Sequence, residues 1–482
     1  MQHMLRSYEC GEYTMSEEKR DGIKAHKARI EQRERVMGRK VHEERKAAHR
    51  KKRRRKRQIQ KLILLAILIL ILMLLFFGCR AVVRGITGSD KKEQKENDQN
   101  QATELQVEGK GDAESKEATA VIATAGDIVM HRPFLESSVY KTGDTYDYNS
   151  IFKYIKDDYN AADFTVLTTE FTLADGEYTG YPMFNSPPEI VTALKNNGID
   201  MCLLANNHIY DSGDDGLLET IEVYEENDLL YNGIRKTEDE KNYVVRDIGG
   251  IKVGFFDYVF ETEGETINGN YVSDKGKALI NSFSESDPQK LYDDIEKNLK
   301  KMENEGVEYT IAYLHWGVEY QTKENEYQDA IAQKLCDMGI DALIASHPHV
   351  IQPVDILTSR DKEHQMLCCY AIGNHLSNQR TEYMDGLVNG YSEDGLIVSL
   401  TIHRGKKGQI TLEETDFTPT WVYHDQNPDN RYFILPLDKP DEIKALPEFE
   451  NASEDIDRSL ERTEGIIGDG VKKIQSVLPL KQ

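Results

Sequence analysis

Short apolar segments that end in polar, metal-binding residue types are the feature of this sequence that most restricts its fold. The segments have the length and composition of buried strands, and stretches with helical periodicity separate them. We expect strands at residues 120–125, 164–169, 201–205, 252–259, 309–314, 342–345, 366–372 and 395–402, and helices at 188–197, 213–226, 288–305 and 326–338. This alternation predicts an α/β domain of layered sheets flanked by helices.

Six of the predicted strands are followed directly by Asp, Glu, Asn or His. In α/β sheets, ligands bind beyond the carboxyl ends of the strands, so these residues are expected to converge. The residues are Asp127, His131, Glu170, Asn206, Asn207, His208, Asp211, His315, Glu319, His347, His349 and Asn374. Each one alone is more often a turn or packing residue, but their conjunction favours a functional site.

The types of side chain in this set indicate a metal centre. Histidine nitrogen together with carboxylate and amide oxygen suits zinc, manganese or iron. His347 and His349 are two residues apart, so on extended backbone both imidazoles would point the same way. A carboxylate can bridge two ions, and two-metal sites stabilise phosphoryl oxygens. We therefore predict a site for divalent metal ions, two in number, of Mn, Zn or Fe.

The order of the motifs resembles the CapA-type poly-γ-glutamate capsule biosynthesis family, which is similar to the calcineurin-like metallophosphoesterases. The motifs that carry the resemblance are GD with a following His, a Glu, ANNHIYDSGDDGL, LHWGVEY, SHPHVIQPVDI and YAIGN. The resemblance covers roughly residues 119–422. It implies a metallophosphoesterase-like fold.

The resemblance also implies a role for each matched residue. One metal would be held by Asp127, Glu170 and His349, with His131 as a further ligand. The other would be held by Glu170, Asn207, His315 and His347, so that Glu170 bridges the ions. His208 would be the general acid or the group that orients the phosphate. Asn206, Asp211, Glu319 and Asn374 would contact the ligands or the substrate.

Four positions depart from the patterns of these families. Thr168 stands where the family usually has Asn, and His375 stands where it usually has Phe. Relative to the phosphoesterases, Glu170 replaces the bridging Asp, and His131 comes four residues after Asp127 rather than two. We expect Thr168 to weaken one side-chain contact and His375 to be either an added ligand or without a role at the metals.

A run of 18 residues at 62–79, LILLAILILILMLLFFGC, has no charged side chain. As a helix it would span roughly 27 Å, close to the hydrocarbon thickness of a bilayer. KKRRRKR precedes it, so the positive-inside rule predicts a cytoplasmic N-terminus and an extracytoplasmic C-terminal domain. The alternatives are a cleaved signal peptide, which the long basic region disfavours, and a lipoprotein cleavage box, which Phe76 fits poorly.

Charge divides the chain at the same place. Residues 1–61 carry a net charge of +12, so the remainder carries −36 of the total of −24. Beside a membrane span, a basic arm is more often drawn to anionic lipid than to nucleic acid, and we expect no nucleic-acid partner. The predicted order is a basic cytoplasmic tail (1–61), a transmembrane helix (62–79), a flexible linker (88–118), a CapA-like domain (119–435) and an acidic C-terminal tail (436–482).

Two functions fit these features. The first is a membrane-anchored, metal-dependent hydrolase of capsule or poly-γ-glutamate synthesis or export, acting on a phosphoester or an anionic polymer. The second is a non-catalytic subunit that binds the polymer beside capsule synthase subunits. The negative charge of the domain disfavours broad nonspecific binding of a polyanion, although a cleft filled with cations could still bind one locally.

Overall fold

The computed structural model describes residues 116–261, 266–384, 389–425 and 431–481. The predicted basic tail, the predicted membrane helix at 62–79 and nearly all of the predicted linker at 88–118 lie outside these ranges. Within the described ranges, no helix combines the length and the apolar character that a membrane span requires. The structure therefore bears on the domain that the sequence predicts from residue 119 onward.

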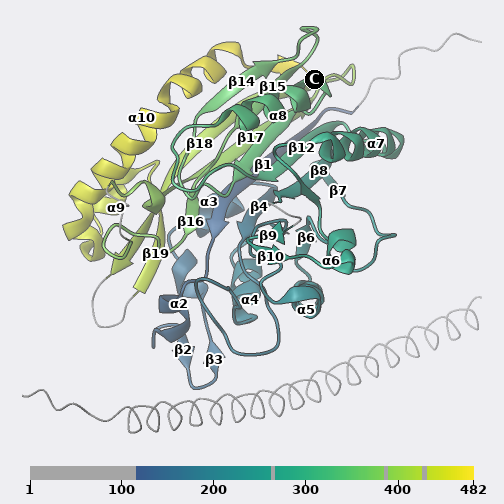
Figure 1. Ribbon diagram of the computed structural model, residues 1–482. Coiled ribbons are helices and arrows are strands. Elements are labelled where there is room, and N and C mark those ends of the chain that lie inside the picture. Colours follow the sequence, from purple (N-terminus) through teal and green to yellow (C-terminus); the bar gives the residue numbers. More distant parts are fainter. Residues whose placement is uncertain (1–115, 262–265, 385–388, 426–430, 482) are drawn as a thin grey trace, which may run out of the picture. The chain divides into compact units, whose positions relative to one another are not determined.

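The first of two large sheets has nine strands, and β1 runs through its middle (Figure 1). On one side of β1 the neighbouring strands run parallel to it. On the other side the long strands alternate in direction, each antiparallel to the one before it. The order is β19 (Arg431–Pro436), β18 (Ile410–Asp425), β17 (Asp394–Arg404), β1 (Ala118–Ile128), β4 (Phe164–Thr169), β5 (Met201–Leu203) and β6 (Leu230–Asn232), with β16 (Asn374–Leu376) on β1 and β20 (Leu480–Lys481) on β18.

The second sheet has seven strands and is parallel through its centre. Its order is β11 (Ser282–Phe283), β8 (Ile251–Phe260), β12 (Tyr309–His315), β13 (Ala342–Ser346), β15 (Gln365–Cys369) and β14 (Val354–Thr358), with β7 (Val244–Ile248) antiparallel on β8.

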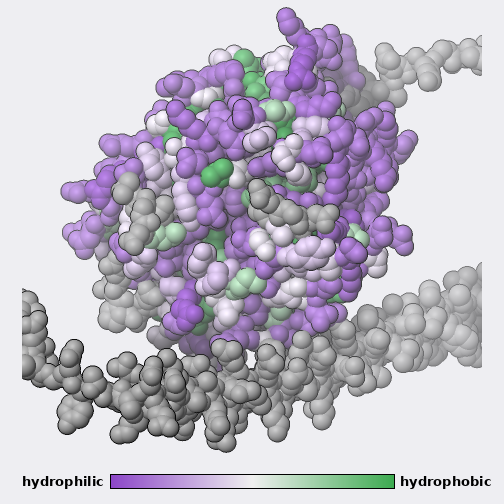
Figure 2. Space-filling model, in the orientation of Figure 1, coloured by the Kyte–Doolittle hydropathy of each residue, from purple (hydrophilic) through white to green (hydrophobic). Residues whose placement is uncertain are grey.

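The two sheets pack face to face, and helices cover their outer faces. Alternate residues of β1 face opposite ways: Ile122 lies in the apolar core between the sheets, and Ala123 lies in the core under the helices. On the first sheet these helices include α4 (Glu189–Asn196) and α5 (Gly213–Glu226), and on the second α7 (Gln289–Glu305) and α8 (Glu326–Asp337). The result is a layered α/β domain, as the sequence predicts. On the face in Figure 2, hydrophilic residues predominate among the described ones.

All of the strands and helices expected between residues 120 and 402 are present, with small changes at their ends. The strands expected at 201–205 and 366–372 end earlier, at Leu203 and Cys369. The sequence did not predict the antiparallel strands β18 and β19, although they complete one side of the first sheet.

The segment predicted as an acidic C-terminal tail is largely folded. After α9 (Pro440–Lys444), the 25-residue helix α10 (Ser453–Val477) packs along β14 and β18 (Figure 1). Ile467 and Ile474 of α10 enter the apolar core between the sheets. Arg462 binds the buried Asp394 through two hydrogen bonds of 2.6 and 2.7 Å. The apolar residues of this helix are sparse among charged ones, so the sequence alone indicates a solvated tail. The contacts with Asp394 and with the core between the sheets show that it is packed on the domain.

Gly126 lets two backbone segments meet beside the end of β1. The pairing of β1 with β4 shifts register between Ala125 and Asp127. The Asp127 N–H donates to the Gly373 carbonyl at 3.1 Å. A Cβ at position 126 would lie 2.0 Å from that carbonyl oxygen, so only glycine fits without moving the backbone.

We expect Gly126→Ala to lower the free energy of unfolding by about 2–4 kcal/mol, because backbone must move to admit the methyl group. Urea denaturation of the purified protein measures the change. Gly465→Ala is the matched control: a Cβ there meets no atom within 4 Å, and alanine favours the surrounding helix. Equal stability of the two variants would contradict this account of Gly126.

Candidate metal centre

The predicted site residues come together at one edge of the two sheets. Asp127 lies near the end of β1, Glu170 follows β4, and Asn207 lies in the loop after β5. From the other sheet, His315 ends β12, and His347 and His349 follow β13. Because these strands are parallel within each sheet, their carboxyl ends meet where the sheets face one another.

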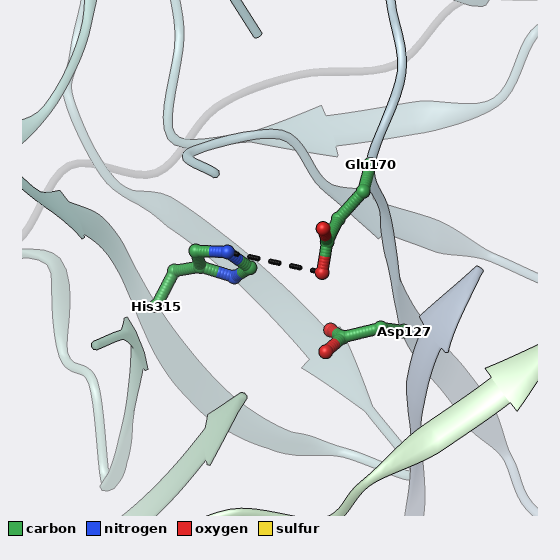
Figure 3. Close-up of side chains that lie close together, drawn as sticks. All are labelled: Asp127, Glu170 and His315. Atoms are coloured by element: carbon green, nitrogen blue, oxygen red, sulfur yellow. Dashed lines mark ion pairs between the residues drawn. The ribbon is translucent and has the colours of Figure 1, made fainter. Parts of the chain in front are cut away.

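The Glu170 carboxylate faces the His315 ring and lies beside the Asp127 carboxylate (Figure 3). One ligand atom each from Asp127, Glu170 and His315 lies within 4.8 Å of the others. Glu170 Oε1 is 3.8 Å from His315 Nε2, and Glu170 Oε2 is 3.8 Å from His349 Nε2. The two oxygens of one carboxylate thus face two different imidazoles, so Glu170 would be able to bind two cations at once.

A first group of donors gathers around His315. His315 Nε2 is 2.9 Å from Asn207 Oδ1 and 3.1 Å from His347 Nδ1. Two ligand atoms that each lie about 2.1 Å from one ion, at right angles, are about 3.0 Å apart. The two short distances are hydrogen bonds, and the same atoms together with Glu170 Oε1, 3.8 Å from His315 Nε2, would be available to one cation.

A second group consists of Asp127, His349 and Glu170. His349 Nδ1 is 3.0 Å from Asn374 Oδ1 and 3.6 Å from Asp127 Oδ2. When Nδ1–H donates to Asn374, the lone pair of Nε2 faces Glu170. Asn374 is fixed in turn, because its amide nitrogen lies within 3.2 Å of His349 O, Gln379 Oε1 and Ser392 O. Such partners set the tautomer of a metal-binding histidine.

His347 and His349 lie on strained backbone rather than on the extended backbone that the sequence suggests. Their φ angles are +98° and +57°, in the left-handed region that non-glycine residues rarely adopt. Each such residue costs about 1–3 kcal/mol. The His347 N–H donates to Asp127 Oδ2 at 3.2 Å, which helps to hold the turn. A tight turn, not strand geometry, brings these two histidines to the cluster.

Burial shifts the pKa of every ionisable group at the centre toward its neutral form. It raises the pKa of Asp127 to about 6 and that of Glu170 well above its usual range. It lowers the pKa of His347 to about 3, and places those of His315 and His349 well below the usual value. Desolvation is the largest cause in each case.

Among the described residues, three carboxylate oxygens at the centre have no hydrogen-bond donor: Asp127 Oδ1, Glu170 Oε1 and Glu170 Oε2. Ionised carboxylates buried without partners are costly, and either a proton, which the raised pKa of Glu170 favours, or a cation would compensate them. Neutral imidazoles are also the form that binds metal. The donor set and the uncompensated oxygens therefore fit divalent cations.

His208 is held by Asp211 beside the cluster. His208 Nδ1 is 2.8 Å from Asp211 Oδ2, and its ring packs edge-on against Phe184 with centroids 4.6 Å apart. The Phe184 N–H also donates to Asp211 Oδ2, at 2.7 Å. With Nδ1 engaged by Asp211, Nε2 is the nitrogen left for proton transfer.

His131 and Asn206 are not seen to contact the carboxylates. His131 Nδ1 is 3.2 Å from the Val129 carbonyl, and among the described residues no ion pair joins His131 to Asp127 or Glu170. Its role as a ligand stays a prediction. Asn206 instead ties the loop together, donating to Thr169 O at 2.8 Å and accepting from His208 N at 3.0 Å.

Glu319 lies on the turn after β12 and reaches solvent. Partial desolvation still raises the pKa of its carboxyl, and the charge of nearby His208 opposes this shift. Glu319 is therefore near the His208 side of the site.

The two departures from the family pattern have separate outcomes. Thr168 Oγ1 lies 3.5 Å from Ser346 Oγ, which is 3.1 Å from His315 Nδ1, so only a weak contact remains there. His375 faces away from Asn374, as alternate strand residues do, and bonds the Tyr159 hydroxyl in the core. It is not part of the cluster.

Asp257, in the middle of β8, was not predicted from the sequence to be important for the site. Its Oδ2 accepts hydrogen bonds from the Leu204 and Ala205 N–H groups, at 3.0 and 3.1 Å, so it joins the two sheets directly beneath the loop that carries Asn207. Burial raises its pKa to about 8. The feature of the sequence that could have identified Asp257 is a lone carboxylate within the otherwise apolar segment FFDYVF.

Comparison with known proteins links this centre to one family. The family model described as "Bacterial capsule synthesis protein PGA_cap" matches residues 121–379. Capsule biosynthesis protein CapA of Bacillus anthracis is 29% identical over 266 residues, covering 53% of this chain and 59% of that protein. PGA biosynthesis protein CapA of Bacillus subtilis is 24% identical over 267 residues, covering 53% and 62%. The chain thus matches about six tenths of the length of each relative.

Among solved structures, the calcineurin-like phosphoesterase YfkN from Bacillus subtilis is similar over 63% of this chain and 91% of that one. The TM-score is 0.38 and the identity 16%. These values are too low to establish a shared fold.

We expect Glu170→Gln to keep or raise the stability of the metal-free protein by about 1–2 kcal/mol, because it removes a buried carboxyl without a donor. With Mn²⁺ added, the variant should gain much less stability than the parent, since a bridging oxygen is lost. Urea unfolding with EDTA or with Mn²⁺ measures both effects. Glu319→Gln serves as the control that keeps the centre intact. Equal stabilisation by Mn²⁺ of parent and Glu170→Gln would contradict the assignment.

Proposed function

The chain belongs to the bacterial capsule synthesis protein family PGA_cap, and from that premise we propose that it is a membrane-anchored, metal-dependent hydrolase of capsule or poly-γ-glutamate synthesis or export. The observation that carries the proposal is the central carboxylate of Glu170. Both of its oxygens are buried without a donor, and each faces a different imidazole.

The side chains of the centre form two groups of donors, each of which would hold one cation. Glu170 lies between the two donor groups and would belong to both. Asn207, His315 and His347 would complete one group, and Asp127 and His349 the other. Divalent cations held there would stabilise negative charge on the oxygens of a phosphoester or a related acyl substrate.

His208 would supply the proton of the reaction. Asp211 fixes Nδ1 and Phe184 fixes the plane of the ring, so that Nε2 can donate to the leaving oxygen. His208 is 6% exposed, and this shields the transferred proton from bulk water. In ester hydrolysis a water molecule would attack the phosphorus or acyl carbon, the bond to the leaving oxygen would break, and His208 would protonate that oxygen. The centre thus offers charge stabilisation and a general acid for this step on neighbouring loops.

The first test measures metal content and turnover of the purified full chain. We expect about two ions per chain and hydrolysis of bis(p-nitrophenyl) phosphate or of poly-γ-glutamate. His208→Asn should keep the metal and lower kcat by about 10²–10⁴-fold, since it removes only the proton donor. His347→Ala should lower the metal content. His403→Ala, on β17, is the control for loss of a histidine elsewhere.

The outcomes separate the two functions. Bound metal without turnover of either substrate would favour the polymer-binding subunit. Absence of metal, together with activity that His347→Ala and His349→Ala leave unchanged, would contradict the hydrolase.

The proposed topology has its own test. In intact cells, a membrane-impermeant thiol reagent should label Ser89→Cys in the linker, in a chain with Cys79→Ser. Cys10, in the predicted cytoplasmic tail, should react only after permeabilisation. Labelling of position 89 only after permeabilisation would reverse the orientation.

A further inference from the structure

A two-stranded hairpin reaches the His208–Asp211 pair from outside the two large sheets. β9 (Thr266–Ile267) and β10 (Asn270–Tyr271) pair only with each other. Asn268 and Gly269 join them with φ angles of +51° and +72°, the Asn-Gly turn that best fits a tight hairpin. Ile267 is buried in the apolar core under the helices and anchors the hairpin there.

Two amides of this hairpin face the two members of the pair. Asn268 Nδ2 is 3.3 Å from His208 Nδ1. Asn270 Nδ2 donates to Asp211 Oδ1 at 3.4 Å, so Asp211 has partners at both oxygens. The hairpin therefore touches the acid's imidazole and the carboxylate that orients it.

Asn268 and Asp211 meet the same nitrogen of His208. Asp211 Oδ2 lies 2.8 Å from Nδ1 and Asn268 Nδ2 lies 3.3 Å from it. An amide carries an acceptor oxygen beside its donor nitrogen, so half a turn of the Asn268 amide lets its oxygen share the proton that Nδ1 donates to Asp211. Asn268 thus adds a second polar contact at the nitrogen that fixes the ring.

We propose that Asn268 is a positioning residue for His208, and that the β9–β10 hairpin strengthens the hold of Asp211 and Phe184 on this imidazole. The proposal rests on the role of His208 given under the proposed function. Removing the side chain loosens that hold and exposes Nδ1, so that Nε2 spends less time aimed at the substrate.

The clean variant is Asn268→Gly, because glycine keeps the positive φ and removes only the side chain. Asn268→Asp keeps the shape and the turn but has no amide. Tyr271→Ala is the matched control: it alters the same hairpin at a side chain that is 66% exposed. All are made in the full chain, and thermal melting confirms that each folds.

With Mn²⁺ and bis(p-nitrophenyl) phosphate, Asn268→Gly should lower kcat about fivefold, the effect of about 1 kcal/mol, with KM nearly unchanged. Asn268→Asp should recover part of that loss, and Tyr271→Ala should show none. A general structural weakening would instead change both kinetic constants, and in Tyr271→Ala as well.

A second readout does not depend on turnover. Carbethoxylation of His208 by diethyl pyrocarbonate, followed by mass spectrometry of its peptide, should be about fivefold faster in Asn268→Gly than in the parent or in Tyr271→Ala. If the parent hydrolyses nothing, the proposed function fails while this rate still decides the role of Asn268. A His208 rate in Asn268→Gly within twofold of the parent would overturn the positioning role.

Discussion

The burial of two neighbouring carboxylates with few donors is the constraint on which the rest of this structure depends. Asp127 and Glu170 are fully buried, and three of their four oxygens have no donor among the described residues, while Asp127 Oδ2 accepts from the His347 N–H. Burial drives the surrounding histidines and the Glu170 carboxyl alike toward their neutral forms. A divalent cation would favour the ionised carboxylates, and the strands, the strained turn at His347 and the glycine at position 126 would then hold its ligands in place.

The two sheets supply different halves of the centre, so their relative placement must be fixed accurately. Asp257 does part of this by accepting two backbone N–H groups of the facing sheet. Gly233, with φ +88°, makes room for it, since a Cβ there would lie 2.2 Å from Asp257 Oδ2. These contacts lie just before Asn207 in the chain, which means that a buried polar link sets the position of a ligand loop.

The sequence was informative about short-range patterns and much less so about long-range contacts. Apolar segments with polar ends were enough to predict the parallel strands and to bring Asp127, Glu170, His315, His347 and His349 to one edge, because parallel strands place their carboxyl ends together. The left-handed backbone of His347 and His349 has no local signature. The contact of Asn268 with His208 joins residues that are 60 positions apart in the sequence. The packing of α10 depends on strands of both sheets, and the sequence of the helix does not indicate which strands these are.

The pairing of β1 has a consequence for how this chain folds. β1 is the first strand in the described sequence, yet one of its long neighbours is β17, where Ala118 pairs with Arg404. Closing so large a loop costs entropy and slows folding. A chain that emerges N-terminus first therefore holds one edge of β1 unpaired until residues near 400 have arrived, and such an edge is open to wrong pairing. For this domain, the strand that carries Asp127 keeps one edge open until late in synthesis.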